Sequence, residues 1–276
     1  MVLASILSVQ CGAALATSIF EEVGPAGTVL LRSLFAALVL WAIARPSLRL
    51  GRERLADILL FAVTLAGMNL CFYEAIDRLP LGVAVTLEFT GPLAVAVLGS
   101  RRRLDLLWAL AAAAGIVLLA EGSFGGESDT VGLLLALGAG AFWGAYILLG
   151  ARLGRNDPGL GALALAMAAS TVLTAPLGIA EGGADLLVAT TLAVGLGVGV
   201  LSSAIPYGLE LEALRRLPQA VFGVLMSLEP AIAALIGFLL LSQDLAAAEL
   251  GGIALVVVAS AGALGSARGS PAPRDG

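Results

Sequence analysis

The sequence predicts an all-α membrane protein of ten transmembrane helices, built as two inverted five-helix repeats with both termini in the cytoplasm. Three observations lead to this fold class: the composition, the spacing of the apolar runs and an internal repeat. Hydrophobic residues make up 59% of the 276-residue chain and charged residues only 13%, and the mean hydropathy is +1.02. Soluble domains carry roughly a quarter charged residues. Most of this chain is therefore expected to face lipid or other lipid-facing helices.

Ten apolar runs are long enough to span a membrane as helices, which takes ~20 apolar residues each. They are separated by short breaks that carry the charges, Pro and Gly. The first run has no cationic segment before it and leads straight into the second, so we expect a retained helix and not a signal peptide. The expected spans are about 2–20, 26–44, 57–76, 81–99, 104–120, 131–150, 159–180, 187–209, 218–241 and 246–265.

The orientation follows from the arginines, which are the only cationic side chains because the chain has no Lys and no His. With the N-terminus inside, 13 of the 15 Arg residues fall in the inside loops and tail. Arg78 alone falls outside, and Arg32 lies within a span. The positive-inside rule therefore predicts cytoplasmic termini.

The chain also resembles itself at a shift of 138 residues. Comparing 74–99 with 212–237 gives ten identities in 26 positions, several of them charged residues or Pro. Because each half holds five spans, an odd number, the second half should lie upside down relative to the first, as in many secondary transporters. The predicted units are residues 1–125 and 126–265, followed by a disordered cytoplasmic tail at 266–276.

Each half carries a predicted helix bend at the same repeat position, Pro92 in the run TLEFTGPLAV and Pro230 in the run MSLEPAIAAL. Pro has no N–H, so the carbonyl four residues earlier loses its helical partner. A carboxylate accompanies each bend, Glu88 in the first half and Glu229 in the second. The two are offset by three residues, about one helical turn, so both can face one cavity.

A charge at the bilayer centre costs at least ~3 kcal/mol on insertion scales, and burial favours the neutral form of a carboxyl group. Glu88 and Glu229 are therefore candidates for proton coupling or for cargo binding. The alternative is a permanently protonated Glu that only packs two helices together.

Other polar residues in the spans are candidates for binding a substrate. Arg32 could hold a substrate carboxylate or could pair with a buried Glu. The remaining candidates could line a polar cavity or could serve as hydrogen-bonding contacts between helices; they are Asn69, Tyr73, Thr90, Tyr146, Tyr207 and Ser227.

Several kinds of site have no support in the sequence. Cys11 and Cys71 lie in apolar runs without metal-ligand spacing, so neither a metal nor another cofactor is expected. The run GLGVG has no Lys and lies within a span, which argues against a phosphate-binding loop. No motif of an intramembrane enzyme is present, and nothing points to nucleic-acid binding.

Three runs resemble the threonine/homoserine exporter branch of the EamA family, within the drug/metabolite transporter superfamily: LGVAVTLEFTGPLAVAVLGSRRRLD, ALGAGAFWGAYIL and LSSAIPYGLELEALRRLPQAVFGVLMSLEPAIAAL. The resemblance extends from about residue 8 to residue 263. It implies a ten-helix exporter of small amino acids in the cytoplasmic (inner) membrane of a bacterium, driven by the proton gradient through alternating access.

Two alternatives stay open at this point. The same fold could export other small metabolites or lipophilic cations, for which the two carboxylates would be counter-ions. The chain could also be a membrane protein that transports nothing. The expected partners are a small-molecule substrate and the lipid bilayer, and the sequence leaves the oligomeric state open.

Overall fold

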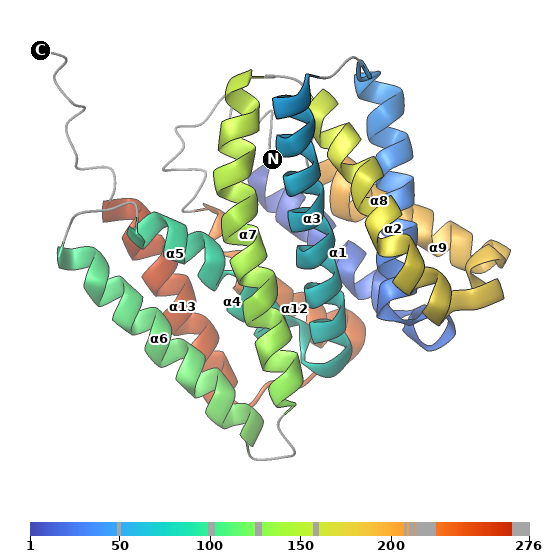
Figure 1. Ribbon diagram of the computed structural model, residues 1–276. Coiled ribbons are helices and arrows are strands. Elements are labelled where there is room, and N and C mark those ends of the chain that lie inside the picture. The colour runs from blue at the N-terminus through green and yellow to red at the C-terminus, as the bar shows by residue number, and fades with distance from the viewer. Residues whose placement is uncertain are drawn as a thin grey trace, which may run out of the picture.

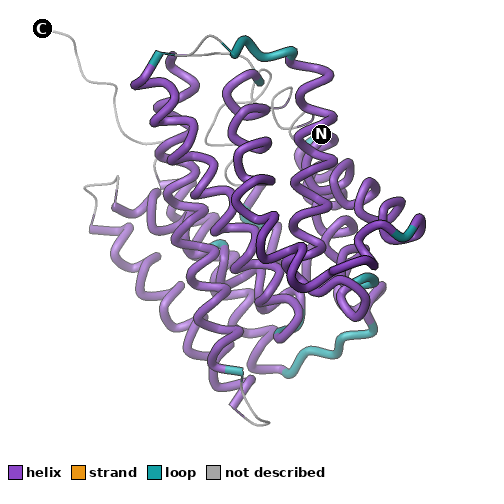
Figure 2. Tube along the Cα trace, turned by 45° about the vertical axis from the view of Figure 1, so that its right-hand side comes forward, coloured by secondary structure: helices purple, strands orange, loops and turns teal. Residues whose placement is uncertain are grey.

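The computed structural model describes residues 1–48, 51–98, 103–124, 129–156, 160–206, 209, 213 and 225–266. Throughout these ranges the chain is helical or forms short connections, and no strand is found in them (Figures 1 and 2). The elements are α1 (Val2–Thr17), α2 (Phe20–Ala44), α3 (Arg52–Arg78), α4 (Leu81–Glu88), α5 (Thr90–Leu98), α6 (Arg103–Phe124), α7 (Thr130–Asn156), α8 (Gly161–Gly182), the 3-10 helix η1 (Gly183–Leu187), α9 (Ala189–Gly199), the π-helical segment η2 (Val200–Ala204), α12 (Glu229–Leu241) and α13 (Ala247–Ser266).

Four helices of the described part are long and apolar enough to cross a membrane: Phe20–Ala44, Arg52–Arg78, Thr130–Gly150 and Gly161–Leu187. Further apolar helices of 10–17 residues accompany them, among them Val2–Thr17 and Glu229–Leu241. The all-helical membrane architecture expected from the sequence is therefore present. The count of ten spans, the inverted repeat and the cytoplasmic termini stay predictions.

The expected span at 81–99 is two helices and not one. α4 ends at Glu88 and α5 begins at Thr90, with Phe89 in a turn between them. The break lies where Pro92 cannot donate a hydrogen bond to the carbonyl of Glu88. α12 begins in a similar way, since Pro230 occupies its first turn directly after a turn at 227–228.

The break packs tightly against the middle of α7. A Cβ atom on Gly140 would lie 2.7 Å from the carbonyl oxygen of Glu88, and a Cβ atom on Gly91 of α5 would lie closer still to the carbonyl oxygen of Gly140. Two glycines thus let the backbones of α5 and α7 meet. This contact fixes the position of Glu88 relative to α7.

The helices pack mainly in pairs from distant parts of the chain. α2 lies along α8, α3 along α7, α4 along α12 and α6 along α13, while α1 packs on α9, η2 and α12. Figure 1 shows α6 and α13 together at one side of the molecule, with α2, α8 and α9 at the other. α1, α3, α4, α7 and α12 lie between these groups and surround the centre.

A glutamine joins the start of α4 to the end of α12. The Gln243 side chain accepts a hydrogen bond of 2.9 Å from the backbone N–H of Leu81, the first residue of α4. The Gln243 backbone N–H donates to the carbonyl of Gly237 in α12. Nearby, Gly82 of α4 packs on the backbone and the Cβ atom of Ala234 in α12, so the two helices approach each other closely.

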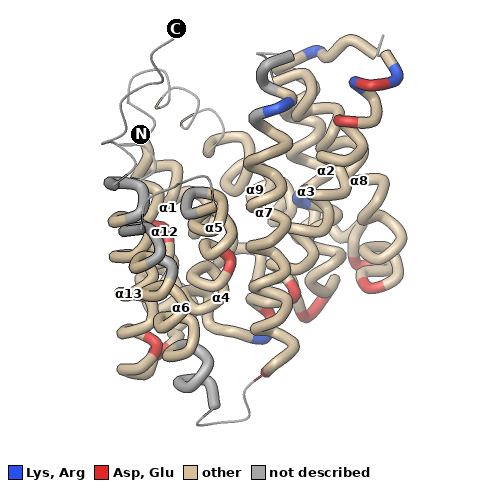
Figure 3. Tube along the Cα trace, turned by 60° about the vertical axis from the view of Figure 1, so that its left-hand side comes forward, with Lys and Arg blue, Asp and Glu red and all other residues tan. Residues whose placement is uncertain are grey.

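Charged side chains gather at the two ends of the bundle. Figure 3 shows most of the blue Arg positions around the upper loops beside α2 and α3, and red Asp and Glu positions frequent around the lower loops. Arg152, near the end of α7, pairs with Asp57, near the start of α3, at 3.1 Å. At the other end of the same two helices, Arg78, the last residue of α3, pairs with Asp129, directly before α7, at 3.1 Å.

Candidate functional site

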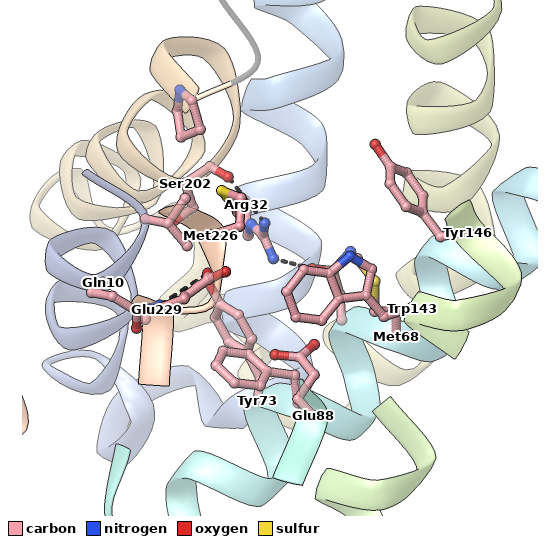
Figure 4. Close-up of a pocket in the computed structure, with 15 residues that line it drawn as sticks. Gln10, Arg32, Met68, Tyr73, Glu88, Trp143, Tyr146, Ser202, Met226 and Glu229 are labelled. Atoms are coloured by element: carbon pink, nitrogen blue, oxygen red, sulfur yellow. Dashed lines mark hydrogen bonds between the residues drawn. The ribbon is translucent and has the colours of Figure 1, made fainter. Parts of the chain in front are cut away.

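A cavity of about 130 Å³ lies at the centre of the bundle, enclosed by α1, α2, α3, α4, α7, η2 and the start of α12 (Figure 4). Its polar lining comes from elements spread over most of the chain: Gln10, Arg32, Asn69, Glu88, Ser202 and Glu229. Aromatic side chains complete the wall: Phe72, Tyr73, Trp143 and Tyr146. Convergent polar groups in a mostly apolar cavity are typical of small-molecule sites.

Arg32 of α2 is held in the cavity by two neighbouring helices. Its guanidinium group donates to the side-chain oxygen of Asn69 on α3 and, at 3.2 Å, to the backbone carbonyl of Ser202. It also lies 5.5 Å from the centre of the Tyr73 ring, within the range of a cation–π interaction. Arg32 forms no ion pair within the described part of the chain. Its positive charge is therefore partly buried and lies beside neutral partners.

The partners of Arg32 are themselves fixed. The Asn69 side-chain amide donates to the carbonyl of Leu65 one turn earlier at 2.8 Å, which directs its oxygen toward Arg32. Tyr73 is 1% exposed and packs against the rings of Phe20 and Phe72. A partly buried guanidinium group held in this way is pre-organised for an anionic group.

The carbonyl of Ser202 is available because η2 is a π-helical segment. A π turn interrupts the regular ladder of a helix and often occurs at functional sites. Gly12 of α1 makes room for it, since a side chain there would collide with Ser202 and Leu201. Ser8 of α1 donates to the carbonyl of Leu201 at 2.7 Å, so α1 holds the irregular segment in place.

Glu88 occupies the last position of α4, and Figure 4 shows its carboxyl group directed into the cavity. Its side chain is partly exposed there. Trp143 of α7 faces the same space and stands edge-on to Phe89, with the ring centres 5.5 Å apart. Tyr146, one turn further along α7, stacks on Phe61 of α3 at 5.0 Å.

Glu229 is the first residue of α12 and is 6% exposed. The Gln10 side-chain amide of α1 donates to its Oε1 atom at 3.2 Å, as the dashed line in Figure 4 shows. The two carboxyl groups of the site thus have different surroundings. Glu88 is partly exposed in the cavity, while Glu229 is buried and is bonded by a side chain of α1.

The structure brings together six of the residues singled out from the sequence. The cavity is lined by Glu88, Glu229, Arg32, Asn69, Tyr73 and Tyr146.

Two other candidates lie elsewhere. The Thr90 hydroxyl donates to the carbonyl of Leu87 at 2.6 Å, and Ser227 is buried outside the cavity lining. Pro92 and Pro230 lie at the two helix breaks and not in the wall. Tyr207 lies outside the described residues, and the roles of all these residues stay predictions.

Sequence reasoning did not single out Gln10 or Trp143. Gln10 is a lone amide in the first apolar run, which is itself a signal of an internal polar contact. Trp143 has no such signal, because a Trp in an apolar helix can face lipid equally well. Among the residues that the structure describes, no group of three or more His, Cys, Asp or Glu could hold a metal ion.

Comparison with known proteins identifies the family. The model of the EamA-like transporter family matches residues 130–265. The threonine/homoserine exporter RhtA of Salmonella typhimurium is 41% identical over 273 residues, which cover 98% of this chain and 92% of that protein. The protein of the same name from Escherichia coli is 41% identical over 264 residues, 95% of this chain and 89% of its own.

Two further matches are more distant. The uncharacterized transporter YwfM of Bacillus subtilis is 28% identical over 210 residues, covering 73% of this chain and 70% of its own. A crystal structure of a protein 21% identical to this chain superimposes with a TM-score of 0.66 over 96% of both chains, which shows a shared fold. The resemblance seen in the three sequence runs is confirmed, and with it the expectation that the chain is not an enzyme. The chain belongs to the EamA-like transporter family.

Proposed function

We propose that this chain is a secondary active exporter of small amino acids of the threonine/homoserine kind, coupled to protons, in the cytoplasmic membrane of a bacterium. One observation carries the proposal: Arg32 and Glu88, of opposite charge, face a single cavity of about 130 Å³. An amino acid is a zwitterion, with a carboxylate for Arg32 and an ammonium group for a carboxylate partner. A guanidinium group suits a carboxylate because its donors form a planar fork.

The relatives support this cargo, since those at 41% identity are named threonine/homoserine exporters. The size of the cavity agrees with a small side chain on the cargo. Trp143, Tyr146 and Met68 leave little space beyond the charged groups. A lipophilic cation fits less well, because the positive charge of Arg32 in the cavity would repel it.

Alternating access by two inverted halves is the proposed mechanism. Its support is the packing of the helices. At the 138-residue shift, α2 corresponds to α8, and α6 corresponds to α13. The pair α4 and α5 corresponds to the segment that ends in α12. In the structure, α2 lies against α8, α6 against α13 and α4 against α12. The contact of α1 with α9 corresponds to that of α7 with α3. Such pairing is expected when a two-fold axis in the membrane plane relates two repeats.

Both halves contribute to the cavity, Glu88 from the first and Glu229 from the second. In the proposed cycle, Glu88 or Glu229 takes up a proton while the cavity faces outward. It releases the proton inside, where the amino acid is loaded. The division into units at 1–125 and 126–265 and the cytoplasmic termini belong to this proposal, and the match of the family model to residues 130–265 supports the second unit.

The experiment is efflux of labelled threonine from vesicles that contain the purified protein, with and without an imposed pH gradient. Gradient-dependent efflux that competes with homoserine supports the proposal. If the folded protein moves lipophilic cations and no amino acid, the cargo is wrong and the transporter fold stands. If nothing in a broad panel moves, the chain is not an exporter.

A further inference from the structure

The two carboxyl groups of the cavity differ in one respect that the proposed function leaves unexplained. Glu88 is partly exposed to the cavity, whereas Glu229 receives a hydrogen bond from a side chain 219 residues away. That partner, Gln10, is 1% exposed. An amide buried to this extent inside a membrane protein needs a hydrogen-bonding partner for both of its ends.

Gln10 has a partner for one end only. Its nitrogen donates to Glu229, while its oxygen, also buried, accepts no hydrogen bond from the described part of the chain. A carboxylate has no proton to donate, but a protonated carboxyl group does. A neutral Glu229 can therefore accept from the Gln10 nitrogen and donate to the Gln10 oxygen, which closes a ring of two hydrogen bonds.

We infer that Gln10 is a positioning residue that holds the carboxyl group of Glu229 between α1 and α12 through this amide–carboxyl pair. Glu229 is then the carboxyl group that binds the proton, and Glu88 is the one that meets the cargo. The inference rests on the proposed function, because it divides the two tasks of an exporter between two residues of one cavity.

The other charged and titratable groups around Glu229 agree with this division. α4, which packs on α12, presents Glu88 to the same cavity, and Arg32 and Tyr73 reach it from α2 and α3. Arg32 is already engaged by Asn69, the Ser202 carbonyl and the Tyr73 ring. On α13, Glu249 accepts from the backbone N–H of Ala246 at the start of its own helix.

The first test is a double-mutant cycle measured as proton-driven threonine exchange. Gln10→Leu keeps the size of the side chain and removes the amide. We expect at least a tenfold lower rate at saturating threonine with a KM within threefold of wild type, and less than a twofold effect in a Glu229→Gln background. An equal effect in both backgrounds would overturn the inference, because residues that act through each other are not additive.

A second variant covers the case in which Gln10→Leu does not fold. Gln10→Glu places two carboxyl groups together, and such a pair retains one proton to higher pH. We expect the pH profile of exchange to move by about one pH unit or more toward alkaline values. Thr17→Val is the matched control on α1, since its hydroxyl only bonds the carbonyl of Ala14. A profile unchanged in Gln10→Glu contradicts the pair.

An infrared measurement separates this inference from the cargo assignment, because it needs no transport. The C=O stretching band of a protonated Glu229 is identified by its loss in Glu229→Gln. In Gln10→Leu the band should move to higher frequency, since the carbonyl loses a hydrogen bond. A band at an unchanged frequency rejects the pair even if the protein exports threonine, and a shifted band supports it even if threonine is not the cargo.

Discussion

The guanidinium group of Arg32 lies over the ring of Tyr73, 5.5 Å from its centre, and donates to the Asn69 side chain of the same helix. The charge is thus placed by two neutral side chains of α3 that leave part of its hydrogen-bonding capacity free. A guanidinium group offers five donors, more than Asn69 and the Ser202 carbonyl use. The spare donors can receive a ligand without breaking the existing contacts.

Arg32→Lys should weaken threonine binding by about ten- to a hundredfold. Lys retains the charge but loses the planar fork, and a hydrogen bond to a charged group contributes about 1.5–3 kcal/mol. Equilibrium binding of labelled threonine to purified protein measures the effect. Arg152→Lys serves as a control, since that side chain is 61% exposed and pairs with Asp57 away from the cavity. Similar losses in both variants would point to a general effect of removing Arg.

Glu88→Gln should remove the dependence of threonine binding on pH while the protein still folds. A Gln is close to the neutral carboxyl group in shape but cannot gain or lose a proton. The measurement is threonine binding and gradient-driven efflux across a pH series. Glu21→Gln is the matched control, because Glu21 is an exposed acid in the first turn of α2. An unchanged pH profile in Glu88→Gln would show that the ionisation of Glu88 does not control cargo binding.

Trp143→Ala should widen the range of cargo. The indole lines the cavity and stands against Phe89, so its removal frees space next to Glu88. We expect about tenfold better competition by leucine or phenylalanine against labelled threonine, with a smaller change for homoserine. Leu148→Ala is the control, since that side chain of α7 is 62% exposed. Equal discrimination in wild type and Trp143→Ala would show that the indole does not set the size limit.

Gly140→Ala should destabilise the protein. The new methyl group would lie 2.7 Å from the Glu88 carbonyl oxygen, and overpacking of this kind costs about 1–3 kcal/mol. The midpoint of thermal unfolding in detergent measures the loss. Gly251→Ala is the matched control, because no atom lies within 4 Å of the added methyl group. Ala also has the higher helix propensity, so this variant should be as stable as wild type or slightly more so.

Asp129 should contribute stability that is lost in acid. The backbone N–H of Gly132 and the Arg78 guanidinium group hold the pKa of Asp129 below its ordinary value. The contribution is therefore present above the unfolded-state pKa and disappears as the pH falls through the lower folded-state pKa. Thermal midpoints of wild type and Asp129→Asn should differ near neutral pH and converge in acid. A difference that persists at the acid end would rule out ionisation of Asp129 as its cause.

The parts of the fold that depend on local chemistry could be predicted from the sequence. Pro92 predicted a bend, and the helix is interrupted three residues earlier, because the missing N–H acts within one turn. Arg32 and Asn69 were candidates for a polar cavity, with contacts between helices as the alternative, since a polar side chain in lipid must face the interior. Thr90 shows the limit of this reasoning, because its hydroxyl is satisfied by its own helix.

The parts that depend on contacts between distant segments could not be predicted. The π-helical segment η2 has no local signal, and Gly12 and Ser8 of α1 are what hold it. The bond between Gln10 and Glu229 joins residues 219 positions apart, and neither residue indicates the other. Arg32 had an alternative partner in a buried Glu, and the structure instead places it against Asn69 and a backbone carbonyl.

Gln243, which joins the start of α4 to the end of α12, has a mechanical consequence. Gln243 and the contact between Gly82 and Ala234 hold α4 and α12 together, so we expect the two helices to move as one unit. Glu88 is the last residue of α4 and Glu229 is the first residue of α12, so both lie at the helix ends that are away from Gln243. In the proposed cycle, a movement that shifts Glu88 therefore also shifts Glu229 relative to α1. Under the proposed function, this fixed contact between α4 and α12 couples the proton site to the cargo site mechanically, without a chain of contacts across the cavity.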